Sequence, residues 1–553
     1  MKSFHYFLFP FRFDYLDSCV EDRHDFYKSK DFDKRVFYKL NLLFDELKKN
    51  NWEYVPFEFE NNLSYNEFVY FHDFVKDSLF NINKKSDKNS TSYFFRKKLD
   101  DLKLILDIKK SKWIDEKEEI IEKQYELDLI SITLRIFDTG IGILAFEIEN
   151  TKYEDKEDVL NINEYFRRIY PPFVGDKFSF DELEKKYMGN FEIRSSTENK
   201  PLYSQNIKED FKDIQNIKST KISPYILEIL GKNIFTQDIK DKNHFLIQSV
   251  IDERMFVMCW YGNDEMASLA KECWYECKDK EKREDKEKGE DNEKYWKLKD
   301  FWYEFLFVDA NGKSIANKKM QEKILEKSTY LRWLEYGTLY GVSRYSFVNL
   351  TDTKAGFLLD NFKGVYYQML ILALAVRASV LRFSDEITAI SDLKPDDELY
   401  ERVSNLYKNY LRFVNKLYFR EISPQDQAIE IYEIFQEIMK LQRDVMDLDN
   451  EIGKLVNYVY MIQEREENKE MKKLTLAATV LLPPSVIVGF FGMNVFGDKL
   501  SVEGLGWFLF VIILMIGSVI GAFYFVDKKK TKEFIKRVLN GNKNHTTNTD
   551  NSL

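Results

Sequence analysis

The sequence predicts an α/β or α+β domain over residues 1–355, followed by long stalk helices and two membrane-spanning helices. Three observations carry this prediction: alternating apolar runs bounded by turn residues, a heptad seam of apolar residues, and two long uncharged runs near the carboxyl end. The predicted boundaries are 1–355 for the α/β domain, 356–473 for a helical pair and stalk, 474–494 and 507–526 for the membrane helices, 495–506 for an external loop, and 527–553 for a Lys-rich tail.

Composition and charge place the chain among globular proteins. Its 553 residues are 44% hydrophobic, which is enough for a sizeable core. The 83 Lys and Arg against 93 Asp and Glu give a net charge of −10, so no overall basic field exists to attract nucleic acid. The four cysteines show neither a disulfide framework nor a metal-binding spacing.

The first domain shows strand signals at its start and in its middle. The opening MKSFHYFLFPFRFDYL carries Arg12 and Asp14 where a secretory signal needs an apolar core, so it predicts a strand and a cytoplasmic amino terminus. Two alternating runs in SITLRIFDTGIGILAFEIEN flank a turn at Asp138–Thr139–Gly140 and predict a hairpin. Residues 244–264 predict a second strand pair, and the charged run 278–294 predicts a solvated helix extension or loop.

Helical stretches lie between the predicted strands of the first domain, which is why we expect it to be α/β or α+β, and longer helical segments follow from residue 362. Residues 362–390 and 396–419 predict an antiparallel helical pair, and Ser423 with Pro424 predicts the N-cap and first residue of the stalk helix. If this helix runs unbroken to Phe491, it is roughly 100 Å long at 1.5 Å per residue. Its heptad seam packs against a neighbouring helix of the same subunit, against other subunits, or both. The seam comprises Ile434, Ile438, Leu441, Val445, Leu448, Ile452, Leu455, Val459 and Ile462.

The two uncharged runs, 474–491 and 507–526, are each long enough to cross a bilayer. Lysines lie before the first run and after the second, whereas the short connection holds only Lys499. Because Lys and Arg collect on the cytoplasmic side, we expect both termini to be cytoplasmic. We expect the protein to be a multi-pass protein of the plasma membrane.

Gly492, Met493 and Asn494 follow the first run directly, within TVLLPPSVIVGFFGMN. This GMN motif, together with two carboxyl-terminal spans and a long helix entering the first, resembles the CorA-type magnesium transporters and channels. The resemblance implies a funnel-shaped homopentamer that conducts Mg²⁺ and is not an enzyme. It also implies a pore lined by Asn494, Met493, Gly492, Ser485, Leu482, Ala478, Leu474 and Met471.

Asn494 is the predicted contact for the hydrated ion. Mg²⁺ loses its water reluctantly, so a ring of neutral amide oxygens can hold the hydrated ion without trapping it. Met471, Leu474 and Leu482 are predicted hydrophobic constrictions; lipid-facing or interhelix packing is the alternative for the helix residues. The loop departs from the family pattern, because it offers only Asp498 and Glu503 where members carry an acidic MPE-like stretch.

Two aromatic and arginine clusters in the first domain are candidate binding sites for an anionic ligand. Arginine forks suit phosphate and aromatic rings suit stacking on a purine, although core aromatics with surface arginines remain the plainer alternative. The candidate residues are Arg167, Arg168, Arg332, Trp333, Tyr336, Tyr340 and Arg344.

The oversized first domain also resembles that of the CorA-like proteins associated with type III CRISPR systems. This resemblance implies an antiviral effector channel opened by a nucleotide second messenger such as adenylated S-adenosylmethionine (SAM-AMP). The alternative is a housekeeping Mg²⁺ transporter gated by intracellular Mg²⁺. A membrane-anchored enzyme is disfavoured, because no nucleophile and base pair is evident among the residues and only five histidines occur.

Overall fold

The computed structural model describes residues 1–16, 40–80, 90–114, 117–171, 179–196, 200–213, 221–276, 290–393 and 397–492, with Gly506 and a few positions up to Gly517. The chain forms two compact units, Met1–Leu455 and Val456–Leu553. The charged run, apart from its last five residues, and most of the external loop, the second apolar run and the tail fall outside the described residues.

The first unit is built on a mixed, sheet-rich core of 14 described strands. Its main path runs β12-β13-β14-β11-β1-β6-β5-β4-β7-β8, with β10 and β9 added beside β1 and with β3 and β2 beside β5. The strands are β1 (Ser3–Tyr15), β2 (Trp52–Tyr54), β3 (Ser92–Lys97), β4 (Leu102–Ile114), β5 (Lys117–Phe137), β6 (Ile141–Asn150), β7 (Asn190–Ser195), β8 (Pro201–Gln205), β9 (Phe235–Thr236), β10 (Phe245–Ser249), β11 (Phe256–Gly262), β12 (Thr329–Tyr330), β13 (Leu339–Val342) and β14 (Ser346–Thr351).

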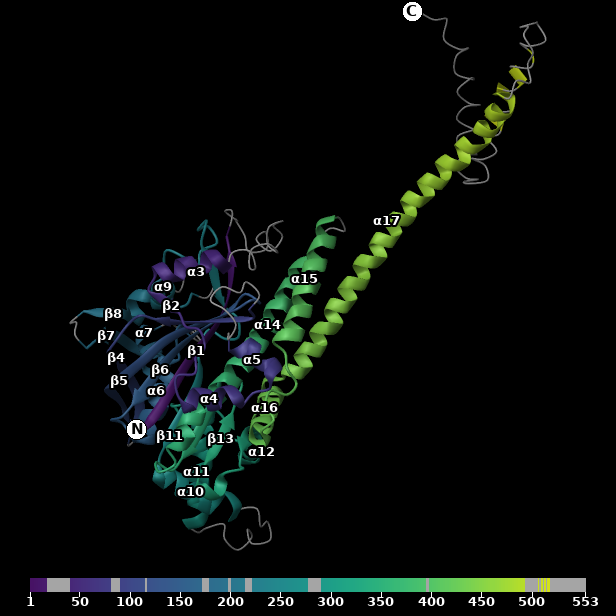
Figure 1. Ribbon diagram of the computed structural model, residues 1–553. Coiled ribbons are helices and arrows are strands. Elements are labelled where there is room, and N and C mark those ends of the chain that lie inside the picture. The colour runs from purple at the N-terminus through teal and green to yellow at the C-terminus, as the bar shows by residue number, and fades with distance from the viewer. Residues whose placement is uncertain are drawn as a thin grey trace, which may run out of the picture. The chain divides into compact units, whose positions relative to one another are not determined.

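The helices occupy both faces of this sheet. Helix α14 contacts β1 and β6, and α15 and α16 pack beside it, as the green ribbons of Figure 1 show. The helical elements are α3 (Leu40–Lys49), α4 (Asn62–Val69), α5 (Asp73–Leu79), α6 (Lys156–Phe166), α7 (Phe180–Lys186), α8 (Ile207–Asp210), α9 (Pro224–Leu230), α10 (Asp264–Glu276), α11 (Glu290–Phe307), α12 (Lys318–Ser328), η3 (Leu334–Tyr336), α13 (Phe357–Asn361), η4 (Phe362–Tyr366), α14 (Tyr367–Ser391), α15 (Asp397–Lys416), α16 (Asp426–Met439) and α17 (Leu441–Gly492).

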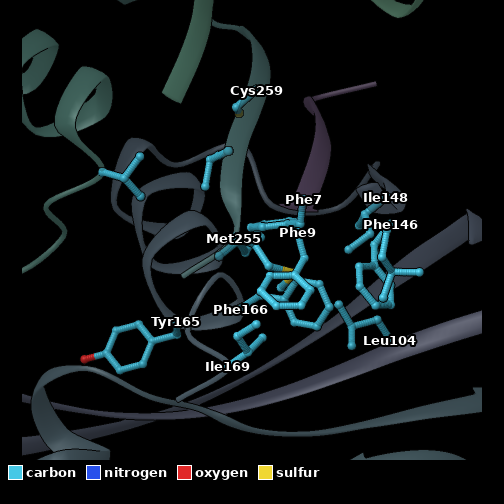
Figure 2. Close-up of a cluster of buried hydrophobic side chains, with 14 of the residues drawn as sticks. Phe7, Phe9, Leu104, Phe146, Ile148, Tyr165, Phe166, Ile169, Met255 and Cys259 are labelled. Atoms are coloured by element: carbon cyan, nitrogen blue, oxygen red, sulfur yellow. The ribbon is translucent and has the colours of Figure 1, made fainter. Parts of the chain in front are cut away.

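Strand β1 lies at the centre of the unit, and its two faces have different environments because successive side chains point to opposite sides of a sheet. Odd-numbered residues such as Phe7 and Phe9 enter a large apolar cluster with Phe146 of β6 and Phe166 of α6 (Figure 2). Even-numbered residues face α14 instead. The ring of Tyr6, for example, lies 4.4 Å from that of Tyr367 between centroids.

The predicted strand at the amino terminus and the predicted hairpin are confirmed. The hairpin consists of β5 and β6, and the turn falls between Phe137 and Ile141, with Gly140 at a φ of 77°. That positive φ is a conformation that glycine adopts without steric cost.

The predicted pairing within residues 244–264 is wrong, although both strands exist. β10 and β11 do not pair with each other; β10 lies along the end of β1 from Phe11 to Tyr15, and β11 lies along its start from Ser3 to Leu8. β11 also pairs in parallel with β14, which makes the sheet mixed. β1 is therefore the pairing partner of both β10 and β11, which the local sequence predicted to pair with each other.

Among the described residues, one helical segment, Phe357–Ser391, is long and apolar enough to cross a membrane by length and composition. However, 89% of its apolar window is buried inside the fold. Such burial is typical of a core helix that is apolar on all sides. The predicted helical pair is confirmed as α14 and α15.

The stalk helix begins and continues differently from the prediction. Its N-cap residue is Gln425, whereas the Ser423 hydroxyl donates to the carbonyl of Tyr70. Lys440 then adopts a left-handed conformation with a φ of 60° and separates α16 from α17. One unbroken helix from Pro424 is therefore wrong. The helix is interrupted by the left-handed backbone of Lys440, and a lysine in the sequence does not predict that conformation.

Candidate functional site

The turn of the β5–β6 hairpin is held by the two helices of the predicted pair. The hydroxyls of Thr139 and Ser379 lie 2.8 Å apart, which joins the turn to α14. The Asp138 carboxylate accepts a hydrogen bond of 2.5 Å from Arg412 of α15. We call the turn residues Asp138, Thr139 and Gly140 the hairpin tip, and it connects the sheet to both helices.

Arg382 of α14 is the buried centre of this contact. Its guanidinium donates to the Gly140 carbonyl at 2.8 Å, to Asp14 of β1 at 2.6 Å and to Glu386 at 2.9 Å. Burial alone would lower the pKa of Arg382, but the two carboxylates outweigh burial and raise it above its usual value. A side chain on Gly140 would collide with this guanidinium.

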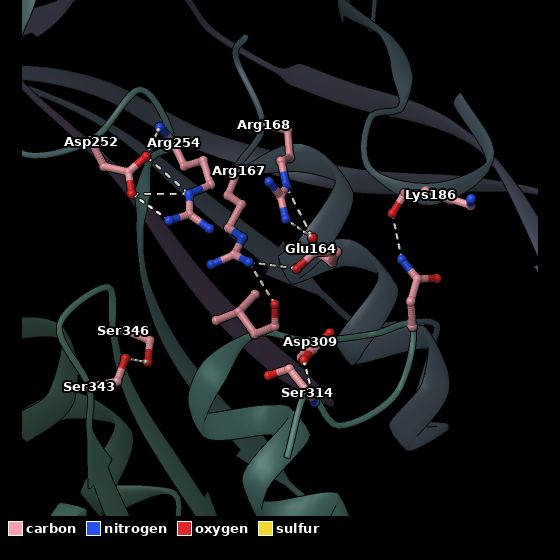
Figure 3. A network of polar contacts seen from close by, with 12 residues as sticks. Glu164, Arg167, Arg168, Lys186, Asp252, Arg254, Asp309, Ser314, Ser343 and Ser346 are labelled. Atoms are coloured by element: carbon pink, nitrogen blue, oxygen red, sulfur yellow. Dashed lines mark hydrogen bonds and ion pairs between the residues drawn. The ribbon is translucent and has the colours of Figure 1, made fainter. Parts of the chain in front are cut away.

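A second set of arginines lies where α6 meets the strands. Arg167 and Arg168 are both buried, and both donate to Glu164, at 2.7 Å and 3.0 Å (Figure 3). Arg167 also donates to the carbonyl of Val308 at 2.7 Å. Arg168 forms an isolated β-bridge with Arg254, which binds Asp252 through two oxygens at 3.0 and 3.1 Å.

Tyr345 extends this set toward α14. The guanidinium of Arg254 lies 4.9 Å from the centre of the Tyr345 ring, and that of Arg377 lies 5.5 Å from it. Arg377 donates to the carbonyl of Arg344 at 2.6 Å. Arg167, Arg168, Arg254, Arg344 and Arg377 thus form one group, which we call the arginine cluster.

The guanidiniums of the arginine cluster differ in their electrostatic environment. Burial opposes the charge of Arg254, but Asp252 and then Glu164 outweigh burial and raise the pKa of Arg254. Burial and then the neighbouring arginines outweigh Glu164 and lower the pKa of Arg167 to about 10. Burial and then Arg344 lower the pKa of Arg377. An additional anion beside Arg167 and Arg377 would stabilise the charged forms of these two side chains.

The remaining predicted ligand residues lie apart from this cluster. Arg332 is bonded to Glu430 of α16 at 2.6 Å, and its guanidinium lies 6.0 Å from the Trp333 ring. Tyr336 is 71% exposed, whereas Tyr340 is buried against Tyr366. Of the seven predicted ligand residues, the structure therefore joins Arg167, Arg168 and Arg344 in one cluster. Their role in binding stays a prediction.

Sequence reasoning missed Arg254, Arg377 and Arg382. A signal existed for the last two, because they are isolated charges within an otherwise apolar helical run, and such charges are usually paired when buried. Arg254 carried no comparable signal. It reaches the cluster only because β11 pairs with β1 and β14.

The predicted pore residues of the apolar run lie on α17 in the second unit. The side chains of Met471, Leu474 and Leu482 are 64%, 67% and 60% exposed in the single chain, and Ala478 and Ser485 are also exposed. Gly492 ends the helix, whereas Met493 and Asn494 fall outside the described residues. Their pore role stays a prediction.

A metal site within one chain is not present among the described residues, where no group of three or more His, Cys, Asp or Glu side chains is placed to hold an ion. The Mg²⁺ of the sequence prediction is a transported or regulatory ion. Mg²⁺ sites formed by carboxylates of two subunits involve a second copy of the chain.

The comparison with known families concerns the helices from α14 onward and the apolar run 474–491 on α17. The family model for CorA-like Mg²⁺ transporter proteins matches residues 372–530. A search of curated proteins found no match. The chain therefore carries a CorA-like Mg²⁺ transporter domain that starts inside α14, and this match supports the CorA family of integral membrane, homo-oligomeric divalent-cation transporters and channels.

Proposed function

We propose that this protein is a CorA-like Mg²⁺ channel whose cytoplasmic domain opens the pore when it binds a nucleotide second messenger such as SAM-AMP. In this proposal it is a membrane effector of type III CRISPR antiviral defence. It works as a homopentamer in the plasma membrane, with both termini cytoplasmic and two spans, 474–494 and 507–526. Asn494 forms the outer ring for the hydrated ion.

One observation carries the gating part of the proposal. The CorA-like match begins at residue 372, yet α14 is bonded to the sheet through Ser379, Arg382 and Asp385. The large first domain is thus joined to the first helix of the transport domain by polar contacts, of which those of Ser379 and Arg382 are buried. A ligand that changes the sheet side of this contact will act on the transport domain.

The exposed apolar side chains of α17 support the membrane part. Leu481, Leu482 and Val486 are each at least 60% exposed, in a stretch without any charged residue. Apolar surface of this extent is stable when lipid or another helix covers it. The alternative function, a housekeeping transporter gated by intracellular Mg²⁺, uses the same pore.

Purified protein in liposomes that contain a divalent-sensitive dye tests the proposal. We expect Mg²⁺ flux to appear only when the messenger is present on the domain side, and Asn494→Ala to change its rate or selectivity. Flux that needs no nucleotide and stops as Mg²⁺ rises on the domain side would instead establish the housekeeping transporter.

A further inference from the structure

A cavity of about 340 Å³ opens between β10 and α14. Arg12 of β1, Gln248 of β10, and Leu381 and Asp385 of α14 line it, together with Lys221 and Gln237. Cavities of about 300–1,000 Å³ are usual for small ligands. None of the five arginines of the arginine cluster lines the cavity, but two lining residues are their neighbours along the chain: Leu381 lies one helical turn after Arg377, and Glu253 precedes Arg254.

The amide of Gln248 has a fixed orientation. Its Oε1 accepts a hydrogen bond of 2.9 Å from Nε of Arg12, whose Nη1 binds Asp385 at 2.6 Å. Because a guanidinium has no acceptor, the oxygen of Gln248 must face Arg12 and its NH₂ must point elsewhere. This buried Nε2 has no hydrogen-bond partner among the described residues.

Gln237 also lines the cavity. Its Nε2 is also buried and has no partner within the described part of the chain. Buried donors without partners cost about 1–3 kcal/mol each, so two of them at one cavity indicate a ligand that accepts hydrogen bonds. Exposed Lys221 adds a positive charge at the rim.

We infer that this cavity binds a nucleoside phosphate of about mononucleotide size. The two amide donors and Lys221 suit the acceptors and the negative charge of a phosphate. Leu381 and the other aliphatic side chains of the wall suit a flat base. Glu253 and Asp385 are acceptors that suit the hydroxyls of a sugar, which a bare phosphate lacks.

This inference rests on the proposed function, because it supplies the site and ligand class for the gating step. Arg12 and Gln248 belong to the sheet, whereas Leu381 and Asp385 belong to α14. A ligand in the cavity therefore contacts both sides of the joint between the first domain and the CorA-like domain.

Calorimetric titration of the full chain in nanodiscs with AMP, adenosine and inorganic phosphate tests the inference. We expect AMP to bind more tightly than either part alone. Gln248→Glu keeps the acceptor for Arg12 but replaces the donor with a negative charge, so AMP affinity should fall by more than tenfold. Gln237→Ala and Lys221→Ala should each weaken it by about 3- to 10-fold, as loss of one hydrogen bond predicts.

Lys232→Ala is the matched control, because Lys232 is an exposed lysine outside the cavity and is paired with Glu228. It should bind AMP like the wild type. Equal AMP affinity in Gln248→Glu, the absence of AMP binding, or equal affinity for AMP and phosphate would each overturn the inference. Messenger-gated flux that survives Gln248→Glu refutes only the cavity. AMP binding that depends on Gln248 without any ligand-gated flux refutes only the gating function.

Discussion

At the scale of single residues, the buried arginine of α14 forms directional hydrogen bonds to the sheet, which apolar side chains cannot form. Arg382 bonds two carboxylates and a backbone carbonyl, and it is itself almost fully buried. Forming such a group costs desolvation energy, but removing one partner leaves charges buried without compensation. The arginine therefore fixes the position of α14 on β1.

Replacing Arg382 by Ala should lower the free energy of unfolding by about 3–5 kcal/mol, because Asp14 and Glu386 stay buried without their cation. Arg443→Ala is the control. Arg443 is exposed and lies 3.5 Å from Asp447, so its loss should cost less than about 1 kcal/mol. Denaturant unfolding of the full chain in detergent measures both. Equal losses of unfolding free energy would show that the buried ion pairs of Arg382 stabilise the fold no more than an exposed ion pair does.

His5 is a buried group whose protonation opposes folding. Its Nδ1 lies 2.7 Å from the Asn163 Oδ1, and its Nε2 lies 2.8 Å from the Ser3 hydroxyl. Because an amide oxygen only accepts, Nδ1 carries the proton of the neutral ring. Burial, opposed only by the bond to Asn163, lowers the pKa of His5 to about 4.

The pH dependence of stability follows from this pKa. The unfolded chain binds the proton near pH 6.5, so the stabilisation from neutral His5 is complete above that pH and is lost as pH falls toward 4. The loss is about 1.4 kcal/mol per pH unit in this window. Thermal unfolding at pH 7 and pH 5 should therefore differ more for the wild type than for His5→Gln. An identical difference for both proteins would contradict the role of His5.

At the scale of elements, the sequence predicted local structure well and distant pairing poorly. Alternation and the Asp138–Thr139–Gly140 turn are local signals, and the hairpin formed where they placed it. β10 and β11 were predicted as strands, but their partner is β1, which lies more than 200 residues earlier. Alternation and turn residues describe only neighbouring positions, so they cannot predict a pairing between strands so far apart in the sequence.

The same distinction applies to the candidate site. Arg167, Arg168 and Arg344 were predicted from residue type and aromatic neighbours. Arg254 and Arg377 join them only through the sheet topology and the docking of α14. The cavity at Gln248 likewise depends on how β10 lies against β1, which the sequence did not reveal.

The break between α16 and α17 gives a prediction at this scale. Lys440 is left-handed, a conformation that costs a residue with a side chain about 1–2 kcal/mol and that glycine adopts freely. Lys440→Gly should raise the free energy of unfolding by up to about 1 kcal/mol, after the greater entropy of glycine in the unfolded chain is subtracted. Lys440→Ala, which keeps the steric cost, should not stabilise. Denaturant unfolding distinguishes the two, and a gain with Ala would show that the backbone conformation is not the cause.

At the scale of the whole molecule, the first domain and the CorA-like domain share a core helix instead of a linker. The unit Met1–Leu455 contains the sheet, α14, α15 and α16, and the family match begins at residue 372 within α14. In the proposed function, a change at the sheet must reach the pore segment through these helices. The hairpin tip, which contacts both α14 and α15, is the contact best placed to transmit it.

The double variant Asp138→Asn with Thr139→Val tests this transmission. Neither residue lines the cavity, so AMP affinity should stay within about twofold of the wild type. The ion pair between Asp138 and Arg412 and the hydroxyl contact with Ser379 are both removed, so messenger-dependent Mg²⁺ flux in liposomes should fall at least tenfold. Wild-type flux in the double variant would show that the signal passes elsewhere, for example through Arg12 and Asp385. A parallel loss of AMP binding would show instead that the hairpin tip supports the cavity, and that binding and transmission are one structural event.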